Sequence, residues 1–181
     1  MNFEKLAQQG RTKLPKSLVS SISPNIVDIR NDNMRSSFEG FFNKNHRLAF
    51  VGSIQSVDFV DDAKAENINS TWYALEDMIK PVVWIVGGND NACDYSKLAD
   101  SVRSKVKSIV YTGVNIDGIL DNFQGLVEKI IIGQSMEDAV SKAFACCERG
   151  DVVLLSPASS DDNYESFHDK GVAFKKAVNK L

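Results

Sequence analysis

Histidine and cysteine are scarce in this chain, and their scarcity limits the chemistry that it can carry. The 181 residues include two histidines and three cysteines. Cys93, Cys146 and Cys147 are odd in number and lack metal-site spacing, so we expect reduced thiols and a cytoplasmic location. His46 and His168 alone give little support to histidine-based metal binding or to a catalytic triad, and we predict no metal site.

Long apolar runs, strong charge and phosphate motifs are also missing. No stretch approaches the roughly 20 apolar residues that span a bilayer, and the start, Met-Asn-Phe-Glu-Lys, lacks a signal-peptide pattern. A formal net charge of −3 gives no electrostatic reason to expect nucleic acid or an anionic membrane as a partner. Neither G-x-G-x-x-G nor G-x-x-x-x-G-K-[ST] occurs in the sequence.

What is present is an α/β pattern organised around residues 81–96. The run from Pro81 to Val86 is apolar throughout and ends at Gly87-Gly88, before a polar loop and a helical pattern. A short strand that is apolar on both faces is typical of the centre of a parallel sheet. Further strands are expected at 108–112, 129–132 and 151–155, and helices at 96–106, 115–124, from the cap at Ser135, and at 165–179. This alternation predicts a Rossmann-like, mostly parallel sheet flanked by helices.

A β-hairpin precedes that sheet in the prediction. The alternation from Leu48 and the run at 57–60 are joined by the polar pair Gln55-Ser56. A polar loop at 61–71 then leads to a helix capped by Asn69 or Ser70. We expect this helix to bury Trp72, Leu75, Met78 and Ile79.

Residues 1–44 are predicted to form a helical N-terminal extension, and 45–181 the main domain. A short helix is expected at about 2–9 and another at 31–42, where Met34, Phe38 and two further phenylalanines recur at helical spacing. The stretch up to residue 26 is rich in serine and contains two prolines, which favours a loop.

Three polar stretches follow predicted strands, and each has two interpretations. Residues 87–91 form either a ligand-binding edge or a tight turn that needs glycine. The loop with Asp61, Asp62, Lys64 and Glu66 suits a magnesium nucleotide, or is simply a solvated charged loop. Residues 156–162 either converge on the same sheet edge or form an ordinary capped helix start.

Several stretches, taken in order, resemble one known family. They are His46-Arg47-Leu48, Val57 through Asn67 with Asn69 through Leu75, Trp84 through Gly88, Ser135 through Val140, Gly150 through Ala158, and Phe167 through Gly171 with Phe174-Lys175. The ordered set resembles the C-terminal domain of Mur ligases, in particular the MurD branch, which joins D-glutamate to UDP-N-acetylmuramoyl-L-alanine. The resemblance covers about residues 27–181 and implies a Rossmann-like fold.

The resemblance also implies cofactors and roles for particular residues. Members of this branch use ATP and magnesium to form an acyl-phosphate, which the amine of D-glutamate then attacks. By motif, Arg47, Asp62 and Lys64 match nucleotide-contacting positions. Ser160 and Phe167 match positions around the incoming D-glutamate.

The departures from the family pattern are concentrated around the substrate. Glu66 stands where the family has threonine, Asn91 where it has lysine, and Asp161 where it has an apolar residue. Each added carboxylate repels an anionic amino acid by about 1 kcal/mol or more at close range. The phosphate loop of the family's central domain is absent from the sequence, so acyl-phosphate formation has lost its main electrostatic machinery.

These observations lead to three functional hypotheses. The first is a non-catalytic binding or regulatory module connected with peptidoglycan synthesis, inactive alone and partnered by a Mur ligase or another wall-synthesis protein. The second is the C-terminal lobe of a split ligase. The third is a nucleotide- or anion-binding module that uses Arg47, Asp62 and Lys64.

Overall fold

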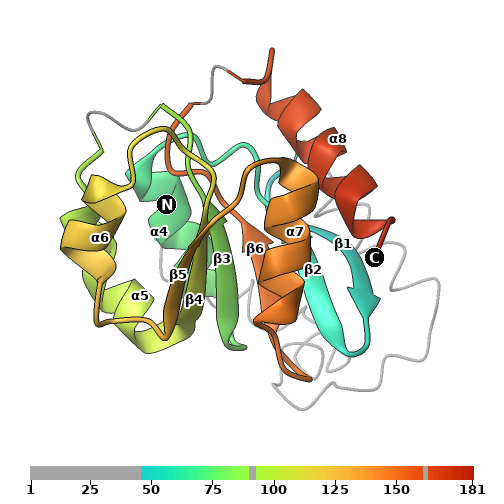
Figure 1. Ribbon diagram of the computed structural model, residues 1–181, viewed down its shortest axis with the longest axis horizontal. Coiled ribbons are helices and arrows are strands. Elements are labelled where there is room, and N and C mark those ends of the chain that lie inside the picture. The colour runs from blue at the N-terminus through green and yellow to red at the C-terminus, as the bar shows by residue number, and fades with distance from the viewer. Residues whose placement is uncertain (1–45, 90–92, 161–162) are drawn as a thin grey trace, which may run out of the picture. The chain divides into compact units, whose positions relative to one another are not determined.

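A computed structural model describes residues 46–89, 93–160 and 163–181, and within them lies one six-stranded sheet (Figure 1). The strand order is β1-β2-β6-β3-β4-β5. The strands are β1 (Ala49–Ile54), β2 (Val57–Asp61), β3 (Val82–Val86), β4 (Val106–Tyr111), β5 (Lys129–Ile132) and β6 (Val152–Leu155). Only the β1–β2 pair is antiparallel, so the predicted mostly parallel sheet entered through a hairpin is confirmed.

Helices cover both faces of the sheet (Figure 1). They are α4 (Ile68–Asp77), the 3₁₀ helix η1 (Tyr95–Leu98), α5 (Ala99–Lys105), α6 (Asp117–Phe123), α7 (Met136–Ala145) and α8 (Phe167–Val178). Side chains of α4, η1, α5 and α6 form one core cluster with the sheet, and those of α7 and α8 form the other. The result is the three-layer arrangement expected of a doubly wound fold.

Strand β3 lies at the centre of the sheet, within the apolar run that predicted a strand. All five of its residues are buried, and they alternate between the two core clusters: Trp84 packs with the α4 side and Ile85 with the α7 side. The indole Nε1 of Trp84 donates a hydrogen bond to the carbonyl oxygen of Ser156 at 2.8 Å. A continuous apolar run is therefore what this position requires.

The hairpin turns at Gln55 and Ser56, whose φ angles are 51° and 68°. Positive φ at both central residues matches the right-handed twist of the flanking strands. Strand β2 then pairs in parallel with β6, from Asp58 opposite Val152 to Asp61 opposite Leu155. This pairing joins the hairpin to the main sheet and carries Asp61 to the strand ends.

The predicted helix at 96–106 is wrong in detail. Its first turn is the 3₁₀ helix η1, and α5 ends at Lys105. Val106 is the first residue of β4, where it pairs with Val82. An apolar residue at this position fits the inner face of either element, and pairing with the central strand decides between them.

The buried face of α4 differs from the prediction. Leu75 is buried, but Trp72 is 40% exposed and Ile79, beyond the helix, is 97% exposed. Thr71 and Ala74 take the inward positions instead. Thr71 is drawn inward because its Oγ1 lies 3.0 Å from Ser156 Oγ in a buried hydrogen bond.

The cap of α4 was also misplaced by sequence reasoning. The N-cap is Asn67, whose Oδ1 accepts a hydrogen bond from the backbone N–H of Ser70 at 2.9 Å. We expect Asn67→Ala to lower the free energy of unfolding by about 1 kcal/mol, because this donor loses its partner. Asn69→Ala, on the exposed surface of the first turn, is the matched control and should change little. Urea denaturation measures both, and equal effects would contradict the assignment of the cap.

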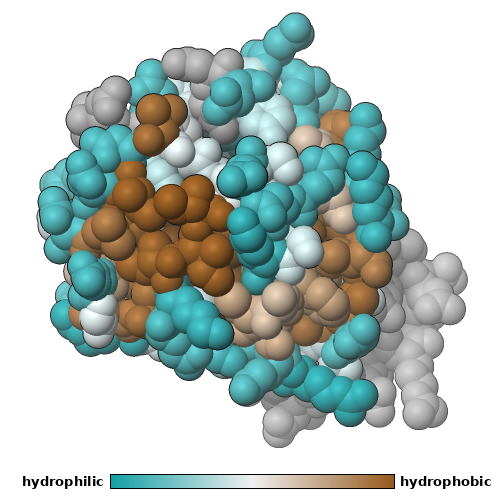
Figure 2. Space-filling model, in the orientation of Figure 1, coloured by the Kyte–Doolittle hydropathy of each residue, from teal (hydrophilic) through white to brown (hydrophobic). Residues whose placement is uncertain are grey.

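Strand β5 forms an exposed edge of the sheet. Its outer side pairs with no strand among the described residues, and Ile132 is 54% exposed. Figure 2 shows an apolar patch over this strand, between α6 and α7.

No helix within the described ranges has the length and apolar composition needed to cross a membrane. The predicted extension at 1–44, with its helices at 2–9 and 31–42, lies outside the described residues.

Candidate functional site

Loops that follow four parallel strands meet at one edge of the sheet, which we call the carboxyl edge (residues 61–67, 87–89, 112–113 and 156–160). The amide of Gly87 donates to the carbonyl of Pro157 at 3.2 Å, and the amide of Asn89 donates to that of Ser160 at 2.7 Å. The amide of Ala158 donates to the carbonyl of Ala65 at 2.8 Å. The Gly-Gly stretch and the serine stretch therefore share an edge, as predicted, and the acidic loop joins them there.

Asp62 is the most perturbed acid at this edge. Its side chain is buried, with Oδ1 accepting from the backbone N–H of Leu48 at 3.2 Å and Oδ2 accepting from Ser156 Oγ at 3.1 Å. Burial raises the pKa of Asp62 to about 7, although both hydrogen bonds and the nearby Arg47 charge oppose the shift. Near neutral pH this carboxyl group can therefore accept a hydrogen bond or donate one.

Arg47 and Asp62 line a common hollow of about 220 Å³, together with Leu48, Ser70, Tyr73, Ala74 and Asp77. We call it the Arg47 hollow. Left-handed backbone at His46 (φ 53°) and Leu48 (φ 45°) flanks Arg47. The amide of Lys64 donates to the carbonyl of His46 at 3.2 Å, which ties this segment to the acidic loop. Arg47 and Asp62, which are 15 positions apart in the sequence, are therefore held beside the same hollow.

Lys64 does not line the Arg47 hollow. Its Nζ lies 5.3 Å from the ring centroid of Phe167, at the start of α8, in a cation–π contact. One residue matched to nucleotide binding therefore touches one matched to the D-glutamate position. This contact brings the two groups of predicted residues together, which sequence spacing could not show.

A second hollow, of about 420 Å³, contains two of the predicted substrate positions. Glu66 and Ser160 line this Glu66 hollow. Its other lining residues are Asn67, Ile68, Asn69, Asn89, Cys93, Asp94, Lys97, Ala158 and Ser159. The buried Ser159 Oγ has no hydrogen-bond partner among the described residues. Asn91 and Asp161 lie outside the described residues, so their predicted roles stay predictions.

Sequence reasoning missed a group of side chains around the buried His46. His46 Nδ1 lies 2.6 Å from Asp61 Oδ2, and His46 Nε2 lies 2.8 Å from His168 Nδ1. The other carboxylate oxygen of Asp61 accepts from the amide of Ala63 at 3.0 Å. The two histidines are 122 positions apart, and no sequence signal connects them. Within the described ranges, no group of three or more His, Cys, Asp or Glu side chains is arranged so that it could hold a metal ion.

Cys147 is not suited to act as a nucleophile. Cys147 packs beside the α7–α8 cluster, and its Sγ donates to the carbonyl of Ala143 at 3.3 Å. Burial raises the pKa of the Cys147 thiol to about 12, which keeps it protonated. Cys147 is therefore a packing residue.

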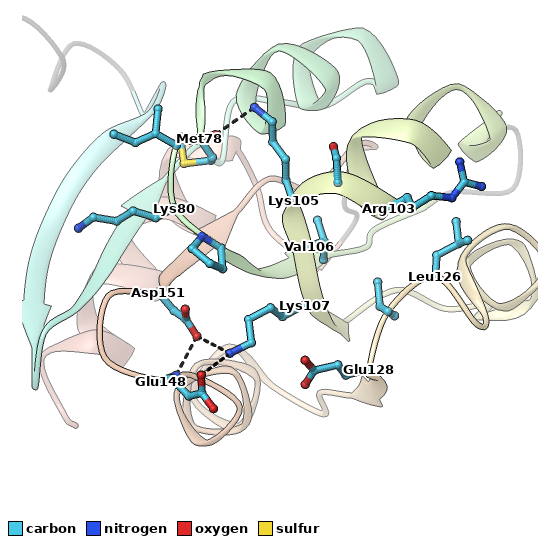
Figure 3. Close-up of a pocket in the computed structure, with 14 residues that line it drawn as sticks. Met78, Lys80, Arg103, Lys105, Val106, Lys107, Leu126, Glu128, Glu148 and Asp151 are labelled. Atoms are coloured by element: carbon cyan, nitrogen blue, oxygen red, sulfur yellow. Dashed lines mark hydrogen bonds and ion pairs between the residues drawn. The ribbon is translucent and has the colours of Figure 1, made fainter. Parts of the chain in front are cut away.

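A larger hollow, of about 890 Å³, opens at the opposite edge of the sheet (Figure 3). Its cations are engaged in structural contacts: Lys107 bridges Glu148 and Asp151 at 3.1 and 3.0 Å. Lys105 donates to the carbonyl of Met78, just after α4, at 3.0 Å. Because these charges are neutralised within the fold, we place the candidate site at the carboxyl edge.

Comparison with known proteins identifies the family of the chain. A family model described as "Mur ligase, glutamate ligase domain" matches residues 46–159. The chain belongs to this Mur ligase family. The matched range covers β1 through β6 and includes Arg47, Asp62 and Lys64. The resemblance found from motifs alone is confirmed.

Curated relatives narrow the family to one branch. The UDP-N-acetylmuramoylalanine–D-glutamate ligase of Porphyromonas gingivalis is 37% identical over 179 residues, which are 98% of this chain and 40% of that enzyme. The enzyme of the same name from Cytophaga hutchinsonii is 43% identical over 147 residues, or 81% of this chain and 33% of that enzyme. The chain thus spans about 40% of the length of such relatives. The Porphyromonas alignment also extends into the first 26 residues, where motifs showed no resemblance.

A solved structure shows the same fold at low sequence identity. The murein peptide ligase Mpl from Psychrobacter arcticus superposes with a TM-score of 0.52 at 12% identity, over 76% of this chain and 30% of that protein. At this identity the likeness concerns the fold alone. It confirms a Rossmann-like domain of Mur ligase type.

Proposed function

We propose that this domain acts in peptidoglycan synthesis as a binding module that holds part of a nucleotide at the carboxyl edge. In this proposal the 181-residue chain has no ligase activity by itself. The observation that carries it is the convergence of Arg47 and Asp62 on one hollow. A guanidinium group suits a phosphate, and a carboxyl group suits ribose hydroxyls or a hydrated magnesium ion.

The size of the Arg47 hollow limits what it can hold. Its volume of about 220 Å³ falls below the range of about 300–1,000 Å³ that is usual for pockets enclosing a whole ligand. A nucleotide would therefore place one part in the hollow and leave its remaining groups across the mouth. Arg47, which is exposed, is available to contact those groups.

The substrate side supports the absence of ligase activity. Glu66 and Asp94 bring two carboxylates to the Glu66 hollow, against one cation at Lys97. An anionic amino acid meets net repulsion there. The sequence also contains no phosphate loop to hold the transferred phosphoryl group. We expect no ATP-dependent ligation of D-glutamate by this chain alone, and measurable turnover would overturn that part of the proposal.

Titration calorimetry with Mg-ATP tests the nucleotide site. We expect Arg47→Ala to weaken binding by about tenfold or more, because a charge-assisted hydrogen bond to phosphate is lost. Lys64→Ala should weaken it less, since Lys64 also engages Phe167. Arg103→Ala, at the opposite edge of the sheet, is the charge-matched control and should bind like the parent protein. Equal affinities of all four proteins would remove Arg47 and Lys64 from the site.

A second candidate function is that of a C-terminal lobe that completes a ligase whose other domains lie on a separate chain. It is favoured by an alignment that takes in 98% of this chain but only 40% of the Porphyromonas enzyme. Mixing this chain with that enzyme truncated before the matched region tests it. D-glutamate-dependent phosphate release on mixing, together with co-elution, would support the lobe. No release and no association would count against it.

A further inference from the structure

The two histidines of this chain contact each other through facing ring nitrogens, next to the proposed nucleotide site. His46 Nε2 and His168 Nδ1 are 2.8 Å apart. On its other side the His46 ring meets the fully buried Asp61, with 2.6 Å between Nδ1 and Oδ2. His46 precedes Arg47, and His168 is the second residue of α8, which Ser166 caps. The contact therefore joins the Arg47 segment to the start of a helix.

The number of protons in this contact determines whether it holds. The Asp61 carboxylate accepts, so His46 Nδ1 must carry a proton. One proton must then lie between His46 Nε2 and His168 Nδ1, donated by either ring. We propose that His46 and His168 form a single-proton latch, which positions the start of α8 against the nucleotide edge and opens on acidification. A second proton between the rings places two N–H groups face to face and removes the bond.

The charged groups around the latch favour one extra proton and oppose the next. Asp61, on β2, faces His46 and stabilises a first positive charge. Lys175, from α8, lies 3.6 Å from the same Asp61 oxygen and opposes a second. Lys64, from the loop after β2, reaches the neighbouring Phe167 ring and adds to that opposition. Opening the latch therefore requires a second proton between the two rings, added against the charge of both lysines.

Close packing links the latch to the backbone of α8. A Cβ built on Gly171 would come within 2.0 Å of His46 Nδ1, so the helix backbone lies directly against the imidazole. The Phe167 ring makes an edge contact with His46, at 6.3 Å between centroids. When the bond to His168 is lost, the first turn of α8 is released together with Phe167 and its contact to Lys64. The consequence for ligand binding rests on the proposed nucleotide function.

Hydrogen exchange of the amides of Asp169 and Lys170, which donate to the hydroxyl and the carbonyl of Ser166, tests the latch without any ligand. We expect protection, corrected for intrinsic rates, to fall about tenfold between about pH 7.5 and pH 5 in the parent protein. His168→Asn keeps an N–H donor near the Nδ1 position but does not titrate, so its protection should stay high at both values. His168→Ala should be weakly protected at both. Lys176→Ala, exposed on the same helix, is the control and should follow the parent protein.

A second arm measures Mg-ATP affinity of the same proteins at both pH values. Protonation of the nucleotide itself lowers the affinity of the parent protein and of His168→Asn alike, so it cancels when the two are compared. Between the two pH values, the parent protein should lose about threefold to tenfold more affinity than His168→Asn. If exchange follows the expected pattern but no variant binds Mg-ATP, the latch stands and the nucleotide function falls. Equal pH dependence of exchange in the parent protein and His168→Asn would overturn the latch, as would normal protection in His168→Ala at about pH 7.5.

Discussion

Replacement of Gly87 by alanine is expected to remove about 3 kcal/mol or more from the free energy of unfolding, a large share of the stability of an ordinary domain. A Cβ at this position would lie 2.3 Å from the backbone nitrogen of Gly113 and 2.9 Å from two backbone atoms of Thr112. The φ angle of 136° adds strain for any L side chain. Backbone atoms cannot swing aside as a side chain can, so the ends of β3 and β4 must separate.

Two other glycines separate the contributions of backbone strain and of steric clash to this loss of stability. Gly125 has a φ of 84° but open space around its Cβ position, so Gly125→Ala should cost about 1 kcal/mol through backbone strain alone. Gly52 has neither a clash nor a positive φ, and its substitution should be nearly neutral. Urea denaturation of the three variants gives the ranking. If Gly87→Ala were no worse than Gly125→Ala, close approach of the backbones would not be the reason for this glycine.

The conformation of Gly87 bears on the two interpretations of residues 87–91, a ligand-binding edge or a tight turn that needs glycine. Gly87 fits the interpretation as a turn that needs glycine, because its φ lies in the region that L side chains avoid. The two interpretations are compatible, since a Cβ on Gly88 would clash with the Ser160 carbonyl oxygen and with Ser159 Oγ, both at the carboxyl edge. The turn allows the strand ends to approach, and their approach forms the edge on which the candidate site depends.

Elements whose pattern comes from burial in the sheet could be predicted from the sequence. Strand β3 is apolar on both faces because helices cover both, and β5 was also placed with its observed bounds. The face of α4 could not be predicted. Thr71 is buried because its hydroxyl forms a hydrogen bond with the hydroxyl of Ser156, in the loop after β6. The two residues are 85 positions apart in the sequence. Val106 likewise fits helix or strand until it meets Val82.

The candidate site shows the same limit. Motif resemblance placed Arg47, Asp62 and Lys64 in one group, but the structure puts Lys64 against Phe167 and not in the Arg47 hollow. The line of contacts from Asp61 through His46 to His168 combines a strand, a preceding segment and a helix. Such groups are defined by tertiary contacts, and single-sequence patterns describe only neighbours along the chain.

Asp62→Asn is expected to stabilise the domain at alkaline pH. Burial raises the pKa of Asp62 to about 7 from the 3.8 of an unperturbed aspartate, so between these values the folded state keeps a proton that the unfolded state has released. Stability then falls as the pH rises through this window, and the loss is complete above about pH 7. Asparagine cannot ionise, so the variant escapes this loss.

The size of the gain follows from the shift and from the hydrogen bonds that asparagine must replace. A shift of about three pKa units corresponds to about 4 kcal/mol. One carboxylate oxygen becomes an amide that must donate to Ser156 Oγ or turn toward Leu48, which offsets part of the gain. We therefore expect Asp62→Asn to be more stable than the parent protein by about 2 kcal/mol at pH 8.

Denaturant unfolding of both proteins from about pH 4 to pH 8 measures this difference. It should be small or negative near pH 4, grow through the window, and level off above about pH 7. Because the His46–His168 contact is present in both proteins, its own pH dependence cancels in the difference. A difference that stayed constant across the range would mean that Asp62 ionises as freely in the folded domain as in the unfolded chain. The carboxyl group would then be fully charged at neutral pH, and its proposed contact with a nucleotide would be that of a pure acceptor.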